Sequence, residues 1–151
     1  MSRSRGGGRI FEILALACTA LFAGAAAYIS FVEHPARMSC GTAVALAEFR
    51  PSYRRATVMQ ASLAVAGAAT AILAWASNRD MLELVAGLLL GSVVPFTLLL
   101  ILPTNRRLEE PSLDASPAEA AAPLRRWGRL HAVRTIAGLA AFALLVARLA
   151  R

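Results

Sequence analysis

Four apolar runs constrain this chain more than any other feature. The first, from Ile13 to Val32, holds 20 residues without a charge, and the second runs from Thr57 to Ala76. The third covers Met81 to Leu102, and the fourth has its uncharged part at Thr135–Ala147. About 20 apolar residues in a helix cross the hydrocarbon core of a bilayer. The mean hydropathy of +0.58 is likewise too high for an ordinary soluble domain. We therefore predict an all-α, integral membrane four-helix bundle with spans at about 10–32, 57–77, 81–102 and 131–150.

The N-terminal segment is polar before the first run begins. Residues 1–9 are basic and Gly-rich, so we expect a disordered basic tail. A basic start, an apolar stretch and three alanines at 25–27 also suit a cleaved signal peptide. We favour a retained first span, because the run is longer than a usual signal core and three more apolar runs follow.

Polar segments separate the spans. Residues 33–56 are expected to form a loop, with helix ends near Pro35 and Pro51 and a short interfacial helix over 43–49. The segment 108–124 carries three prolines and many alanines and predicts a flexible loop. The link from Ser77 to Asp80 is so short that the second and third spans should form an antiparallel hairpin.

Pro95 lies inside the third span and should kink it. The kink has two interpretations. It is a packing feature, or it opens a cavity toward the Pro103 end of the span. A kink frees a backbone carbonyl that a neighbour or water must satisfy.

An antiparallel four-span topology places four polar segments on one membrane face. They are the end of the first span, the start of the second, the end of the third and the start of the fourth. The chemistry-bearing residues there are Glu33, His34, Tyr53, Asn105, Trp127, His131 and Arg134. The sequence thus predicts that any functional site lies at this end of the bundle.

The start of the fourth span carries a stripe of candidate residues. Trp127, His131 and Arg134 are spaced four and three apart, so a helix places them on one face, which Gly138 continues. Gly138 would leave room for a flat ligand or for a closely packed helix. Taken singly, these residues also suit an interfacial Trp, a loop-capping His and an Arg that reaches the lipid phosphates.

Metal binding is an alternative with few ligands. Glu33, His34 and His131 are of the right types for Zn, Fe or Cu. The spacing is not diagnostic, however, and the chain has two histidines in all. We predict neither a metal nor another cofactor, and keep a metal-dependent membrane oxidase as an alternative. No motif for a Ser–His or Cys–His nucleophile is present in the sequence.

Charge constrains the partners. Every basic residue is Arg, and the arginines lie between apolar runs rather than in a block with interleaved aromatics. We therefore expect the lipid bilayer as a partner and no nucleic acid. A homo-oligomer or a partner membrane protein is compatible with the sequence. The loops after spans one and three carry more arginine than the other polar segments, which favours a cytoplasmic location for both.

Five motifs resemble one known family. They are Glu33–Arg37, Arg50–Arg55, Pro95–Leu98, Pro103–Leu108 and Trp127–Arg134. In these residues the chain resembles the small four-helix membrane proteins related to fungal anthrone oxygenases, over about residues 10–150. In bacteria most members are a domain of unknown function, and this chain looks like that branch. The resemblance implies the bacterial inner (plasma) membrane.

The resemblance also implies an activity: oxidation of a lipophilic aromatic compound of the anthrone or quinone type. The reaction needs a base to form a carbanion that reacts with dioxygen, donors for an enolate oxygen and an apolar slot for the rings. His131 is the candidate base, with Glu33 or His34 to orient it. Asn105, Tyr53 and Arg134 are candidates to stabilise developing negative charge, and Trp127 to stack on a ring. The alternative is a non-catalytic small-molecule binder or partner subunit that uses the same residues as anchors.

Overall fold

The computed structural model describes residues 3–151, with side chains from Gly8 onward. Six α-helical segments and two π-helical turns form four rods. The first rod comprises α1 (Arg3–Tyr28), η1 (Ile29–Glu33) and α2 (His34–Ser39), and the second is α3 (Thr42–Asn78). The third comprises α4 (Met81–Phe96), η2 (Thr97–Ile101) and α5 (Leu102–Glu109), and the fourth is α6 (Pro117–Leu149). All four rods are long and apolar enough to cross a membrane, which confirms the predicted fold class.

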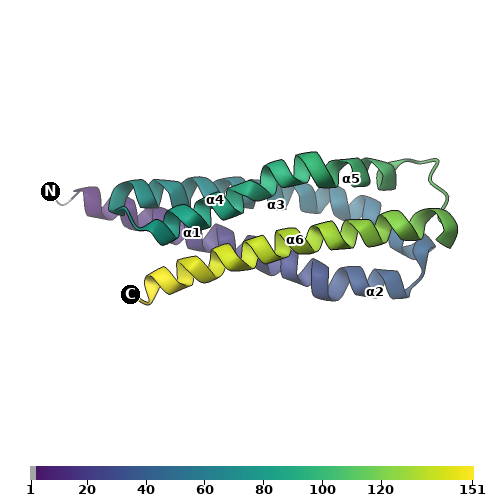
Figure 1. Ribbon diagram of the computed structural model, residues 1–151, viewed down its shortest axis with the longest axis horizontal. Coiled ribbons are helices and arrows are strands. Elements are labelled where there is room, and N and C mark those ends of the chain that lie inside the picture. The colour runs from purple at the N-terminus through teal and green to yellow at the C-terminus, as the bar shows by residue number, and fades with distance from the viewer. Residues whose placement is uncertain (1–2) are drawn as a thin grey trace.

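The rods run antiparallel along one axis. Both termini and the α3–α4 turn lie at one end, and the α2–α3 and α5–α6 connections lie at the other (Figure 1). The main packing pairs are α1 with α3, α3 with α4, α4 with α6 and α6 with α1. The predicted hairpin between spans two and three is confirmed. Arg79 closes α3 in the left-handed conformation, with φ of 62°, and Asp80 caps α4 by accepting a hydrogen bond from the Leu82 N–H at 2.9 Å.

The rods extend well beyond the predicted spans. The predicted loop at 33–56 is helical except at residues 40–41, and α3 passes through Pro51 without ending. That end of α3 is held by tertiary packing, because Ala45, Leu46 and Phe49 are buried in a second apolar cluster. The predicted loop at 108–124 is shorter in the structure and covers only 110–116. The helix α6 begins at Pro117, and proline is favoured at the first helical position because the backbone N–H that it lacks would have no helical partner there.

The start of α1 also differs from the expectation. The helix begins at Arg3, within the segment predicted as a disordered tail, and residues 1–2 of that prediction lie outside the described residues. Gly8 lies against Ser77 near the end of α3: a Cβ on the glycine would be 3.3 Å from the Ser77 Cβ. This contact packs the extended start of α1 against the end of α3.

Two π-helical turns interrupt the first and third rods, each just before a proline. In η1 the His34 N–H donates to the Ile29 carbonyl, five residues back, and Pro35 follows. In η2 the Leu102 N–H donates to the Thr97 carbonyl, and Pro103 follows. The predicted disturbance of the third span therefore extends from Pro95 into η2. Such turns are frequent at functional sites, and η1 and η2 lie in the half of the bundle where the predicted site residues gather.

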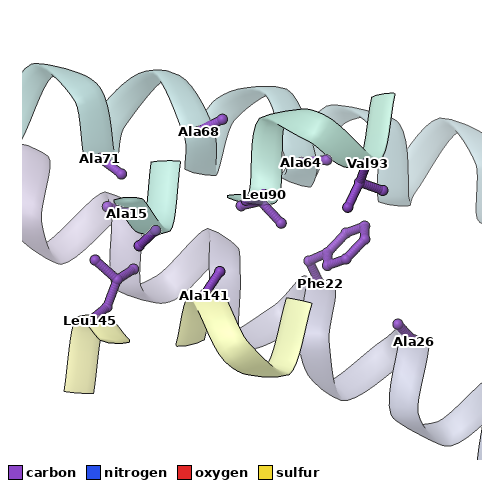
Figure 2. Packing of buried hydrophobic residues seen from close by; sticks show 11 residues of the cluster. Ala15, Phe22, Ala26, Ala64, Ala68, Ala71, Leu90, Val93, Ala141 and Leu145 are labelled. Atoms are coloured by element: carbon purple, nitrogen blue, oxygen red, sulfur yellow. The ribbon is translucent and has the colours of Figure 1, made fainter. Parts of the chain in front are cut away.

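Small residues hold the middle of the bundle together. Its core cluster is mostly alanine, with Phe22 of α1 beside Val93 of α4 (Figure 2). Gly67 of α3 faces Leu90 so closely that a Cβ would be 2.7 Å from Leu90 Cδ2. Close approach of helix backbones is what drives association in lipid, where the hydrophobic effect between helices is absent.

The end of the bundle opposite the predicted site is joined by ion pairs. Arg148 of α6 lies 2.6 Å from a Glu12 oxygen of α1 and 3.1 Å from a Glu83 oxygen of α4. Glu83 is 2% exposed. Glu83 therefore does not reach outward to the interface, because Arg148 compensates its charge inside the bundle.

Candidate functional site

A small polar cavity lies between the rods in the half of the bundle that carries the α2–α3 and α5–α6 connections. Six of the eight predicted site residues line it: Glu33, Tyr53, Asn105, Trp127, His131 and Arg134. Every rod contributes at least one of these residues, and they lie at one end of the bundle, as the antiparallel order of the spans predicts. The cavity measures about 30 Å³, enough for about two water molecules.

His131 is the most buried titratable group of this cavity, at 2% exposed. Its Nδ1 lies 3.1 Å from Ser30 Oγ of the π-turn η1. Ser30 Oγ lies 2.8 Å from Thr135 Oγ1, which is 3.1 Å from the Ala26 carbonyl oxygen. A chain of three polar side chains thus ends on a backbone carbonyl, which can only accept.

The direction of this chain determines which imidazole nitrogen carries the proton. When the Thr135 hydroxyl donates to the Ala26 carbonyl, Thr135 Oγ1 accepts from Ser30, and Ser30 Oγ in turn accepts from His131 Nδ1–H. In this arrangement the His131 N–H and the two hydroxyl protons each take part in one hydrogen bond. It leaves the Nε2 lone pair of the neutral ring free, and Nε2 has no hydrogen-bond partner within residues 3–151. In this direction of the chain, Nε2 is the ring nitrogen that can accept a proton.

Aromatic side chains surround the imidazole. The Trp127 ring stacks on His131 with centroids 4.8 Å apart and an interplanar angle of 26°. Phe49 meets Trp127 edge-on at 5.2 Å, and Tyr53 stacks on Phe49 at 5.5 Å. The Arg37 guanidinium lies 5.7 Å from the Trp127 ring centroid. Trp127 packs within the protein, so its stacking face is already occupied by His131.

Glu33 lines the cavity but does not hydrogen-bond to His131. One of its oxygens accepts from Arg37 and, at 3.0 Å, from Ser52 Oγ. Arg37, 6% exposed, also lies 2.8 Å from a Glu48 oxygen. The prediction that Glu33 or His34 orients His131 is thus corrected: Ser30 makes that contact, and Glu33 joins α2 to α3.

Amide and guanidinium groups line the rest of the cavity with free hydrogen-bonding capacity. Asn105 Nδ2 donates to Tyr53 Oη at 3.0 Å, and Arg134 donates to Gln60 Oε1 at 2.9 Å. Asn105 Oδ1, Gln60 Nε2 and Arg134 Nε are buried and have no partner among the described residues. Buried polar atoms are nearly always paired with protein or water, so these three atoms can bind water or another small molecule with both donor and acceptor character.

Two predicted residues lie outside the cavity. His34 packs against Trp127 at 5.2 Å, in a space that Gly128 leaves open. Gly138 faces Phe22, and a Cβ there would be 2.8 Å from two ring carbons. The space above the stripe therefore holds a closely packed helix, which was one of its two predicted uses, and not a flat ligand.

The three candidate metal ligands do not converge. Within the described part of the chain no three His, Cys, Asp or Glu side chains gather as a metal site would need. His34 and His131 each pack against Trp127, and Glu33 is bound by Arg37 and Ser52. These residues do not fit a metal in this arrangement, and the metal-dependent alternative stays a prediction.

A second cavity adjoins the polar one between α3 and α4. It measures about 130 Å³ and shares Tyr53, Thr57 and Arg134 with the polar cavity. Its other lining residues are Ala61, Ala64, Val93, Val94, Thr97 and Leu98. These flank Pro95 and the start of η2, where the sequence analysis allowed for a cavity. The second cavity is largely apolar, whereas the lining of the first has a larger polar share.

Three site residues escaped the sequence analysis: Ser30, Gln60 and Thr135. Each is a polar side chain within or at the edge of an apolar run. Polar groups at membrane depth mostly face the bundle interior, and that signal was available. The sequence does not show which of these polar side chains meet, because partners such as Ser30 and His131 are 101 positions apart.

Comparison with known proteins adds one match. Neither a curated protein nor a solved structure matches the chain. Residues 49–144 match the family described as anthrone oxygenase. The matched segment includes Tyr53, Asn105, Trp127, His131 and Arg134, and leaves out α1 and the π-turn η1, which carries Ser30 and Glu33. Since the match covers well over half of the 151 residues, the chain belongs to the anthrone oxygenase family.

Proposed function

We propose that this protein is a membrane-embedded oxygenase that oxidises an activated methylene group of a lipophilic aromatic ketone of the anthrone type. The observation that carries the proposal is the hydrogen-bond chain from His131 through Ser30 and Thr135 to the Ala26 carbonyl. With the Thr135 hydroxyl donating to that carbonyl, the chain leaves Nε2 unprotonated beside a cavity lined with amide and guanidinium groups. Membership of the family supports the substrate class.

The reaction balances without a further reductant. His131 Nε2 takes one proton from the methylene, and the resulting carbanion is stabilised as an enolate. Dioxygen adds at that carbon, and the peroxide formed takes up a proton. Loss of the second methylene proton together with hydroxide breaks the O–O bond and leaves a carbonyl. Overall CH₂ and O₂ become C=O and H₂O, with the substrate oxidised by four electrons and dioxygen reduced by four.

The cavity residues divide the remaining tasks. Arg134 Nε and Gln60 Nε2 are buried donors without partners in the described chain, and they suit an enolate or peroxide oxygen. Tyr53 Oη accepts from Asn105, so its own proton is free to be donated. Preorganised donors of this kind lower the energy of developing charge most strongly where water is excluded.

The bilayer is the partner that this chemistry requires. An uncharged polycyclic ketone dissolves in lipid, and the four membrane-length helices place the site close to that reservoir. We further propose that the end of the bundle bearing the site faces the cytoplasm of a bacterial inner membrane. This rests on the arginine bias of its two connecting segments.

The test is turnover of anthrone by the purified protein in lipid nanodiscs. Wild type should consume dioxygen and form anthraquinone in equal amounts, followed by an oxygen electrode and by the absorbance of the product. His131→Asn keeps an N–H for Ser30 but has no basic nitrogen. It should fold like wild type and lose about 10²- to 10⁴-fold in turnover, the usual contribution of a general base.

Two controls separate catalysis from folding. Thermal unfolding of His131→Asn should match wild type, and added imidazole should restore part of the turnover of His131→Gly. Anthrone that binds to wild type without being converted would refute the oxygenase and favour the non-catalytic binder. Turnover unchanged in His131→Asn would remove His131 as the base.

A further inference from the structure

The polar cavity is too small for the substrate that the proposed function requires. At about 30 Å³ it holds about two water molecules, whereas an anthrone has three fused rings. Dioxygen and one oxygen-bearing edge of a substrate fit this volume. The rings must therefore lie elsewhere, directly beside the cavity.

The α3–α4 groove, meaning the second cavity, meets this requirement. Its volume of about 130 Å³ is close to that of an engineered apolar cavity that binds benzene, about 150 Å³. Ala61 and Ala64 form the α3 side, and their small side chains leave a slot that faces Val94 and Leu98 on the α4 side. The groove therefore takes about one aromatic ring within the protein.

The groove opens toward the lipid. Leu98 is 57% exposed, and Ala61 is also exposed, although both line the groove. Both residues lie within membrane-length helices, where an exposed side chain contacts acyl chains. A solute dissolved in the bilayer can thus enter sideways without crossing an aqueous phase.

The boundary between the two cavities is polar. Tyr53, Thr57 and Arg134 line both of them. A flat molecule lying in the groove would bring its edge to these three residues, and His131 lies on the far side of the boundary. Recognition by such a site needs a flat, uncharged, apolar body and one hydrogen-bonding edge.

We propose that the α3–α4 groove is the ring-binding subsite and the lateral entrance for a flat polycyclic aromatic ketone from the bilayer. The proposal rests on the proposed function for the identity of the ligand. It is testable without turnover, because a ligand that cannot be oxidised can still bind in the groove.

The probe is 10,10-dimethylanthrone, which has no acidic methylene and cannot be oxidised by the proposed route. As a diaryl ketone it cross-links to nearby C–H bonds on illumination. We would illuminate the wild-type protein in phosphatidylcholine nanodiscs and map the cross-links by peptide mass spectrometry. Cross-links should concentrate on residues of the groove, and excess anthrone without oxygen should suppress these alone. Cross-links spread evenly over the lipid-facing surface would overturn the proposal, since the groove would then hold acyl chains only.

A matched pair of variants sharpens the test. Ala61→Phe fills the groove from an exposed position of α3 and should lower groove cross-linking about tenfold or more. Ala69→Phe makes the same change at another exposed position of α3 that does not line the groove, and it should leave cross-linking as in wild type. Equal cross-linking in both variants would refute the subsite.

The two proposals fail separately. His131→Asn should lower turnover about 10²- to 10⁴-fold and keep groove cross-linking. Groove cross-linking without any wild-type turnover would refute the oxygenase and leave the subsite standing. Turnover that depends on His131, with cross-links outside the groove, would refute the subsite and leave the oxygenase standing.

Discussion

Replacing Ser30 by Ala should lower turnover without unfolding the protein. Ser30 Oγ is the acceptor for His131 Nδ1–H at 3.1 Å and lies on the π-turn η1. Without it the buried Nδ1–H loses its partner, and the ring is no longer held with its proton on Nδ1. Rings that carry the proton on Nε2, or that rotate, cannot accept a proton from the substrate.

The magnitude follows from that single hydrogen bond. An unsatisfied buried donor costs about 1–3 kcal/mol. Expressed as the population of correctly oriented rings, this is about a 5- to 150-fold loss in kcat. KM should change little, because Ser30 does not line either cavity. Thr135 keeps its contact with the Ala26 carbonyl, so the packing of α1 against α6 should survive.

The assay compares Ser30→Ala with Ser30→Thr in nanodiscs. Threonine retains the hydroxyl and should recover most of the turnover. A substrate deuterated at the methylene adds a second readout, because a poorly oriented base makes proton removal slower and the isotope effect on kcat larger. Wild-type kcat in Ser30→Ala would refute the orienting role. A fall in kcat that tracks a fall in melting temperature, in both variants, would show a structural role instead.

Further expectations concern charge stabilisation, packing and topology. Arg134→Met should lower kcat about 10²-fold or more, as loss of an oxyanion donor does, with Arg134→Lys less affected; equal kcat in the two would contradict this role. Gly138→Ala should destabilise the protein by about 1–3 kcal/mol in thermal unfolding, because its Cβ would be 2.8 Å from the Phe22 ring. Gly24→Ala is the control and should lack this penalty, because a Cβ there would meet no neighbour within 4 Å in the described part of the chain. Arg148→Leu should lower the free energy of unfolding by about 3 kcal/mol, because it leaves the charge of the buried Glu83 uncompensated. Adding Glu83→Gln should restore most of this stability, and a double variant as unstable as Arg148→Leu would contradict the pairing. Cys40 is exposed and lies in the α2–α3 connection, which is proposed to face the cytoplasm. In a Cys18→Ala background, a membrane-impermeant maleimide should therefore label Cys40 in lysed cells but not in intact cells. Labelling of intact cells would reverse the proposed orientation.

Much of this molecule could be predicted from hydropathy and topology. Uncharged runs of about 20 residues predict spans because the cost of exposing backbone and charge to lipid depends on local composition. An even number of antiparallel spans then places the ends of particular spans on the same side. Those two steps sufficed to place Tyr53, Asn105, His131 and Arg134 at one end of the bundle, and the structure shows that they line one cavity there.

The helix ends were predicted less well. Prolines and charges at 33–56 and 108–124 indicated loops, yet most of both segments is helical. The helix through Pro51 is held by tertiary packing, such as that of its Phe49 against Trp127 of α6. Arg37 is held by Glu33 and Glu48 from two rods. The helix propensity of a local segment does not include the effect of such contacts between rods.

The sequence by itself determined the four spans, their antiparallel order and the end of the bundle at which polar residues gather. Only the tertiary structure decided that Ser30 orients His131, that Phe22 fills the space beside Gly138, and that an apolar groove adjoins the polar cavity. The physical reason lies in helix rotation. Each π-turn adds a residue and turns the following helix by about 100°, so the faces that meet across the bundle do not follow from a period of 3.6 residues.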